Sequence, residues 1–229
     1  MPIRIIRASR SALGAIFLGL LVACAATNPA SPGDTGDATL PEARLAEAEA
    51  AFDRGEYPAG ARMYRGAAEG SDDELVAEQA TRAAFDHTQL RVAALAADRW
   101  LEINPTSENA HRYAGIVALK LHRIDDAEAQ FGYLLDTVYV SPAAGFLALL
   151  PVIGDEGVAT DVMELFRRLS ARHPSVGEGH YAYGSAALRA DNFAVAAKSA
   201  ETAVAKAPFW KPAKMLLART RIATGKDDE

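Results

Sequence analysis

Residues 177–208 decide the fold, and they read GEGHYAYGSAALRADNFAVAAKSAETAVAKAP. Gly184 stands at the eighth position of this stretch, Asp191 at the fifteenth and Pro208 at the thirty-second. Two helical segments therefore flank a turn-forming residue, and a proline stops the second segment. Small side chains at the eighth position and at the twentieth, Ala196, let two helices approach closely. The stretch predicts a pair of packed helices joined by a tight turn.

The same spacing of small residues and turn formers returns about every 34 residues along the chain. Units begin at residues 41, 74, 108, 143, 177 and 211. The eighth position holds mostly small residues: Ala48, Thr81, Gly115, Leu150, Gly184 and Ala218. The fifteenth position holds mostly turn formers: Gly55, Thr88, His122, Gly157, Asp191 and Gly225. An alanine-rich helical bundle is the alternative, but a bundle does not need turn residues and prolines that return in register.

This pattern resembles the tetratricopeptide repeat (TPR), and the quoted stretch is its strongest copy. Unit three is nearly as good a copy, with Tyr113 and Gly115 in its first helix and Phe131 in its second. The resemblance implies an all-α fold. It implies a right-handed α-solenoid of about five helix-turn-helix units over residues 41–224.

Some units depart from the repeat. Units one, two and four lack the aromatic residue at the eleventh position, where they have Ala51, Ala84 and Ile153, and the first units are expected to be short or irregular. Pro151 stands inside the first helix of unit four, where it removes a hydrogen bond and is expected to kink or shorten that helix. The helix at 211–224 is either a C-terminal cap or half of a sixth unit. Residues 225–229 form a charged tail.

The first 24 residues resemble the signal of a bacterial lipoprotein. Three arginines precede an uncharged run over residues 11–23, which is shorter than a bilayer-spanning helix. The run ends in Leu21-Val22-Ala23-Cys24, which is similar to the lipobox of that family. An ordinary secretory signal that contains a cysteine is the alternative.

The lipobox resemblance implies a processing scheme and an address. Residues 1–23 would be a removed signal peptide, Cys24 would carry the lipid, and residues 24–40 would include a flexible tether. Ala25, rather than an aspartate, follows the cysteine. The resemblance therefore implies the outer membrane of a Gram-negative bacterium, with the protein facing the periplasm.

Composition and charge argue against several classes of protein. A hydrophobic content of 50% argues against disorder, and an aromatic content of 7% argues against a β-sandwich or barrel. The single cysteine excludes an intramolecular disulfide and a multi-cysteine zinc site. Removal of residues 1–23 takes away three of 24 basic residues and no acidic one, so the net charge changes from −6 to −9. This balance argues against nucleic-acid partners, and membrane contact is expected through the lipid.

Sequence motifs for catalysis were not found. The chain has no His-Glu-x-x-His, no Gly-x-Ser-x-Gly and no phosphate-cradling glycine loop. Paired carboxylates at 72–74 and 125–126 fall at helix starts, where acids complement the helix dipole. His111 and His180 occupy a fourth position that is usually a packing site. We therefore expect no enzyme, no metal site and no cofactor besides the covalent lipid on Cys24.

The TPR resemblance places the binding surface in a concave groove lined by the first helices. Positions two, five, nine, twelve and thirteen of each unit face this groove in the family. The mapped candidates for contacting a partner are Phe52, Arg82, Phe85, Arg112, Leu119, Lys120, Tyr181, Arg189 and Arg219. The groove is expected to be acidic near the first unit and basic toward the last. A peptide with acidic residues and an apolar anchor would fit it.

These observations predict a non-enzymatic protein–protein interaction scaffold in envelope assembly. The resemblance associates such lipoproteins with pilus, secretion, outer-membrane or cell-wall machinery. The partners are expected to be envelope proteins or peptides. The alternative is a regulator or substrate-delivery module of a cell-wall enzyme, or a weak enzyme of unrecognised type.

Overall fold

A computed structural model describes residues 41–225 of the chain. The signal peptide, Cys24, the tether and the last four residues of the tail lie outside the described residues. Their assignments therefore stay predictions.

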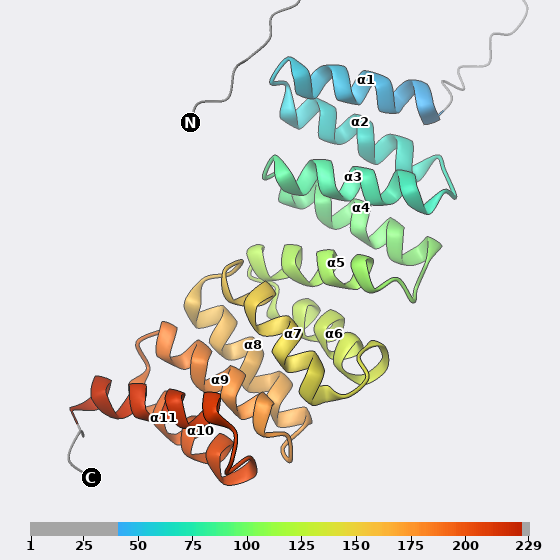
Figure 1. The fold of residues 1–229 in the computed structure, drawn as a ribbon. Helices are drawn as coiled ribbons and strands as arrows, with labels where there is room; N and C mark the ends of the chain where they lie inside the picture. Colours follow the sequence, from blue (N-terminus) through green and yellow to red (C-terminus); the bar gives the residue numbers. More distant parts are fainter. Residues whose placement is uncertain (1–40, 226–229) are drawn as a thin grey trace, which may run out of the picture. The chain divides into compact units, whose positions relative to one another are not determined.

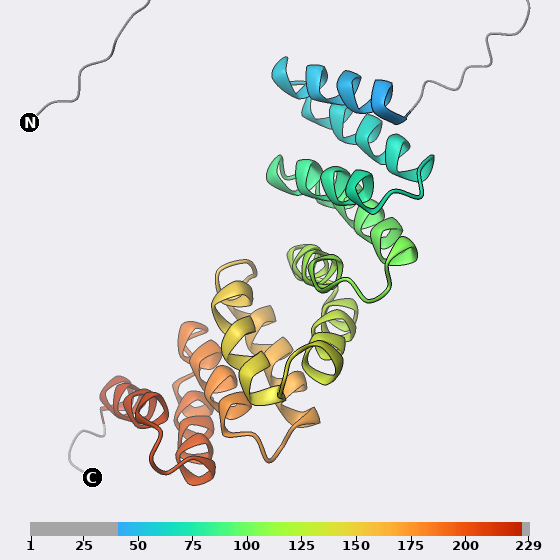
Figure 2. The ribbon, with the colours of Figure 1, turned by 45° about the vertical axis from the view of Figure 1, so that its right-hand side comes forward.

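Residues 41–225 form helices and no strand, and the helices follow one another in chain order (Figures 1 and 2). The elements are α1 (Pro41–Asp53), α2 (Tyr57–Glu69), α3 (Glu74–Asp86), α4 (Leu90–Ile103), α5 (Glu108–Lys120), α6 (Ile124–Tyr133), the π-helical segment η1 (Leu134–Val138), α7 (Pro142–Gly154), α8 (Ala159–Arg172), α9 (Gly177–Arg189), α10 (Phe193–Lys206) and α11 (Lys211–Thr224). The first helices of successive units begin 33 to 35 residues apart. The chain therefore folds as an all-α solenoid of five consecutive helix pairs followed by one further helix.

The fifteenth position of the repeat is where the backbone reverses between two helices. Gly55, Thr88, His122 and Asp191 have φ angles of 76°, 57°, 59° and 55°, in the left-handed region. A residue in this region ends a helix within one turn, which is why glycine and polar residues recur there. Gly157, the equivalent residue of unit four, is not among the residues with positive φ.

Thr88→Gly is expected to raise the free energy of unfolding by about 1 kcal/mol. A β-branched side chain is strained at positive φ, whereas glycine is not. Urea denaturation measures the change. Thr106→Gly is the control, because Thr106 lies in a loop without a positive φ. An equal gain at both positions would contradict the strain at Thr88.

The two helices of a unit touch through the small residues of the repeat. A Cβ atom on Gly60 would lie 3.0 Å from the carbonyl oxygen of Ala48. A Cβ atom on Gly115 would lie 2.8 Å from the ring of Phe131, which is fully buried. The eighth and twentieth positions therefore lack side-chain bulk because the partner helix occupies that space.

Gly184→Leu is expected to lower the free energy of unfolding by about 1–3 kcal/mol. Even a Cβ atom at Gly184 would lie 3.1 Å from Leu216 Cδ2, 3.2 Å from Ser199 Cβ and 3.3 Å from the carbonyl oxygen of Ala196. A leucine overfills this contact between α9 and α10, and the urea midpoint measures the loss.

Gly66→Leu is the matched control, because Gly66 is also helical and a Cβ atom there meets nothing within 4 Å. Its stability should be unchanged or higher, since leucine favours a helix over glycine. A wild-type midpoint for Gly184→Leu would contradict the assigned helix crossing.

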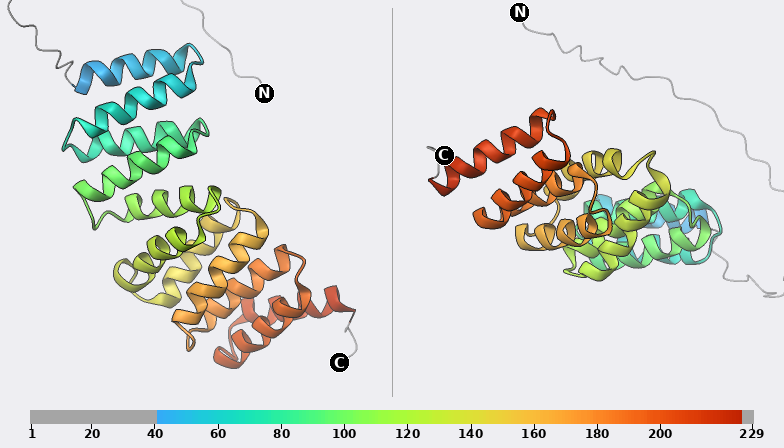
Figure 3. Two further views of the ribbon diagram at one scale, coloured as in Figure 1. Left: turned by 180° about the vertical axis from the view of Figure 1, so that it is seen from behind. Right: turned by 90° about the horizontal axis from the view of Figure 1, so that it is seen from below.

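The helices form two layers, one of first helices and one of second helices. Among the first helices, α3 contacts α5, α7 contacts α9 and α9 contacts α11. Among the second helices, α2 contacts α4 and α6 contacts α8. Figure 1 is viewed from the side of the first helices, and the left view of Figure 3 from the side of the second helices. We call these two sides the first-helix face and the second-helix face.

The buried residues differ between the two ends of the array. Around α1 to α4 the core consists mainly of alanines, with Tyr64 and Trp100 as its large members. Around α5 to α9 it contains Phe131, Phe146 and Phe166 together with many leucines. We call these the alanine core and the aromatic-leucine core.

Unit four is the irregular one, and the expected irregularity of the first units is wrong. Helices α1, α2 and α3 all have 13 residues, and Ala51 and Ala84 at the eleventh positions are fully buried. In unit four, α7 packs mainly against α9 and η1 and only weakly against α8. The missing left-handed turn at Gly157 accompanies this weak pairing.

Pro151 does not shorten its helix. Helix α7 continues past it to Gly154 and has 13 residues, as α5 and α9 have. Pro151 is exposed in the last turn, while Phe146, Leu149 and Ile153 are fully buried. Burial of these three side chains offsets the one backbone hydrogen bond that the proline removes.

Candidate functional site

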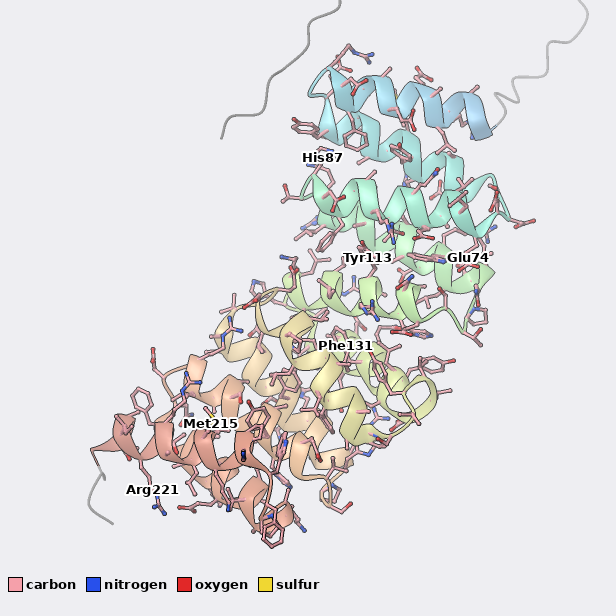
Figure 4. The ribbon with its side chains drawn as sticks, in the orientation of Figure 1. Glu74, His87, Tyr113, Phe131, Met215 and Arg221 are labelled. Atoms are coloured by element: carbon pink, nitrogen blue, oxygen red, sulfur yellow. The ribbon has the colours of Figure 1, made fainter. Side chains whose placement is uncertain are left out.

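Aromatic rings and cations meet where α3 and α5 adjoin on the first-helix face. The Arg82 guanidinium lies 5.8 Å from the centre of the Tyr113 ring, and Tyr113 is placed near α3 in Figure 4. The Phe85 ring meets Tyr113 edge-on, with 5.6 Å between ring centres. Lys120 Nζ lies 5.6 Å from the centre of the Phe85 ring. We call Arg82, Phe85, Tyr113 and Lys120 the cation–aromatic cluster.

Helical spacing places these four side chains on one surface. Arg82 and Phe85 are three residues apart on α3, and Tyr113 and Lys120 are seven apart on α5, so each pair shares a helix side. Cations over aromatic rings contribute about 0.5–1 kcal/mol at exposed sites. Each ring also remains half-exposed, and it therefore offers apolar surface to a partner.

A cleft of about 590 Å³ lies beside the cluster, where the turns of units two, three and four come together. Phe85 and Lys120 line one part of it, and Glu156 and Val158 line another. Lys120 Nζ and Glu156 Oε2 are 2.8 Å apart, which ties unit three to unit four. Val158 is 54% exposed. The cleft thus combines apolar surface with one accessible ion pair.

The cations of the first-helix face have acidic neighbours. Arg82 pairs with Glu78, Arg112 with Glu108, Lys120 with Glu156 and Arg189 with Asp155. The expected increase in positive charge toward the last unit is therefore largely neutralised up to α9. Such surface pairs contribute about 0–1 kcal/mol each, so an incoming carboxylate displaces them readily.

The structure gathers only part of the predicted site. Arg82, Phe85 and Lys120 lie together, with Arg112 further along α5. Leu119 borders the cleft but is fully buried, so it is a member of the core rather than an exposed anchor. It lies in the core because its side chain fills the space beside Gly157.

The remaining candidates lie elsewhere along the array. Phe52 is half-buried and stacks on His87 with 4.5 Å between ring centres. Tyr181 meets Trp210 edge-on at 4.8 Å. Arg219 is exposed on α11.

Tyr113 was missed as a site residue. In the sequence, Tyr113 is an aromatic residue of the repeat pattern in the first helix of unit three. That pattern does not show that its side chain lies on the first-helix face. Its contacts with Arg82 and Phe85 join two different units, and the sequence of a single unit does not contain such contacts.

The paired carboxylates and histidines stabilise the fold. Glu74 accepts hydrogen bonds from Trp100 Nε1 at 2.7 Å and Asn104 Nδ2 at 2.9 Å, and these donors hold the pKa of Glu74 below its usual range. His111 is buried between Gln130 Oε1 at 2.7 Å and the carbonyl oxygen of Pro105 at 3.0 Å.

In residues 41–225, no three His, Cys, Asp or Glu side chains are grouped so as to hold a metal ion. None of the helices that the structure describes has the length and apolar character to cross a bilayer.

Comparison with known proteins yields similar solved structures only. No family model matches the sequence, and no curated protein matches it. PilW, a type IV pilus biogenesis factor, has 15% identity and a TM-score of 0.39, over 82% of this chain and 87% of that one. YrrB, a TPR protein with an unusual peptide-binding site, has 14% identity and a TM-score of 0.39, over 76% and 89%. A TPR protein from Parabacteroides merdae has 14% identity and a TM-score of 0.40, over 84% and 75%.

Proposed function

We propose that this chain is a lipid-anchored, non-enzymatic scaffold that holds another protein of the bacterial envelope on its first-helix face. The observation that carries the proposal is the cation–aromatic cluster together with the adjoining cleft. Aromatic rings and arginines are the side chains that most often dominate binding energy in protein interfaces. Their half-exposed state on a rigid helical face preorganises them for a partner.

The chemistry of this surface defines the segment that it fits. An apolar side chain of the partner would enter the cleft beside Phe85 and Val158. Acidic side chains flanking it would pair with Arg82 and Lys120, with Lys120 released from Glu156. A short acidic segment with one apolar anchor satisfies both requirements.

The proposed cellular location of the scaffold rests on the lipobox-like residues that end in Cys24. An anchor at this cysteine and a tether to residue 40 would hold the array at the periplasmic side of the outer membrane. The partner would then belong to an assembly machine of that compartment, such as a pilus, secretion, outer-membrane or cell-wall machine.

Site-specific crosslinking in intact cells tests the proposed surface. A photoreactive amino acid replaces Asp86 or Val158, two exposed residues that line the cleft, and mass spectrometry identifies the adducts. The same amino acid at Arg62 or Lys198, two exposed positions on second helices α2 and α10, is the matched control. Positions 86 and 158 should yield a defined envelope protein that the control positions do not yield. Equal yields at all four positions would place the partner elsewhere.

A further inference from the structure

The outward side of α11 carries an apolar stripe. Met215 and Ile222 are 65% and 66% exposed, and Ala218 between them is also exposed. The spacing of three and four residues puts all three on one side of the helix. They lie opposite Ala213, Leu216 and Thr220, which are buried against the array.

The repeat register shows what kind of surface this is. Ala218 holds the eighth position, and its equivalents Ala48, Thr81, Gly115 and Gly184 are buried. Gly225 follows α11 in the left-handed region, with φ of 68°, as Gly55 follows α1. Helix α11 therefore presents the surface of a first helix, and no described helix faces that side.

Basic residues flank the stripe. Helix α11 contains four basic residues and no acidic one. Lys214 and Arg221 lie along one flank of the stripe and Arg219 along the other, and all three are exposed. Met215 and Arg221 project from α11 in Figure 4.

Helix α1, at the other end of the array, has the complementary character. It contains four acidic residues and one basic residue. Ala43 and Ala46 are exposed and Ala50 is half-exposed, on the side away from the buried Ala48 and Ala51. Glu47 and Asp53, both exposed, flank these alanines.

The two ends match in shape as well as in charge. The alanine stripe of α1 is shallow, whereas Met215 and Ile222 project from α11, so large side chains would enter the low stripe and allow close helix packing. Acidic flanks would then lie beside basic flanks.

We infer that α11 of one copy binds α1 of a second copy of this chain, head to tail. This contact is heterologous, because different surfaces meet, and each added copy leaves one α1 and one α11 free. Repetition produces a ring or a filament. The inference is independent of the proposed partner on the first-helix face, since it uses only the two end helices. An anionic membrane would match the basic charge of α11. It would not match the fit between the projecting side chains of α11 and the shallow alanine stripe of α1.

Charge exchange between the ends tests the inference. The unlipidated mature chain, residues 24–229, is compared with Glu47→Lys/Asp53→Lys at one end and Lys214→Glu/Arg221→Glu at the other. Analytical ultracentrifugation covers about 1 µM to 1 mM, because a single helix-on-helix contact belongs to the small, weak interfaces. The wild type should associate as its concentration rises, and less so at high salt.

Each double variant alone should associate more weakly than the wild type. Glu47→Lys/Asp53→Lys makes both ends basic, and Lys214→Glu/Arg221→Glu leaves α11 with two basic and two acidic residues opposite the acidic α1. An equimolar mixture of the two variants should associate again, because the unchanged basic α11 of one variant then meets the unchanged acidic α1 of the other. Restoration in the mixture also shows that the variants are folded.

Several results would overturn the inference. A wild type that stays monomeric up to the highest concentration excludes the contact, and so does association of either double variant alone at wild-type strength. Binding of α11 to anionic vesicles by a chain that remains monomeric would assign the stripe to a membrane instead. The variant Arg112→Glu/Arg189→Glu should associate as the wild type does, which separates this contact from the first-helix face.

Discussion

Reversing Arg112 and Arg189 together is expected to abolish capture of the envelope partner. Both residues lie on first helices, α5 and α9. Arg112 pairs with Glu108 and also donates to Asn109 Oδ1, and Arg189 pairs with Asp155. A partner segment rich in acidic residues can displace those carboxylates, but it would be repelled by new negative charges at both positions. Affinity capture of the protein identified by crosslinking, with purified wild-type and variant chains, measures the effect.

Loss of capture in this variant should not reflect unfolding. Like charges one helical turn apart destabilise a helix by about 0.2–0.5 kcal/mol, so helical content and thermal stability should stay near the wild type. Circular dichroism checks both quantities.

The control must lie on second helices and must not disturb packing. Arg168 is on a second helix, but it pairs with Asp125, Glu128 and Glu164 and ties α6 to α8, so its reversal would destabilise the array. Arg62→Glu with Lys198→Glu avoids this problem, since both side chains are exposed. Equal loss of capture in both double variants, or no loss in the first, would show that the partner binds elsewhere.

Cys24→Ser is expected to prevent lipidation completely and to release the protein from the outer-membrane fraction. Serine has no thiol to accept the diacylglycerol, and the chain has no other cysteine that could replace Cys24. Several acyl chains, at about 0.8 kcal/mol per buried CH₂, would otherwise hold the protein firmly in the bilayer.

Metabolic labelling with a radioactive fatty acid, followed by membrane fractionation, measures this effect. The wild type should carry the label and the variant should not. Equal labelling of both would refute the lipobox interpretation, while leaving the helical array and its first-helix face unaffected.

The helix pairs were predictable because their signals are local. A left-handed residue such as Asp191 and a small residue such as Gly184 determine where one unit turns and where its helices touch. The all-α fold and the repeated turns therefore follow from the spacing of a few residue types along one unit.

The site was less predictable because it depends on contacts between units. The sequence places Lys120 and Glu156 36 residues apart, and only the assembled array brings them to 2.8 Å. The neutral balance of the first-helix face, the role of Tyr113 and the burial of Leu119 have the same origin. The weak pairing of α7 with α8 also depends on neighbouring units, because α7 packs mainly against α9 and η1 instead.

The contrast between the alanine core and the aromatic-leucine core has a mechanical consequence. Alanine side chains bury little apolar area, so α1 to α4 gain less free energy on folding than the helices around Phe131, Phe146 and Phe166. In a linear array, opening starts at the weaker end and spreads from unit to unit. A load transmitted through a lipid anchor at Cys24 would reach that end first. The array would then unfold from α1 onward, one unit at a time, before the units around the aromatic-leucine core unfolded.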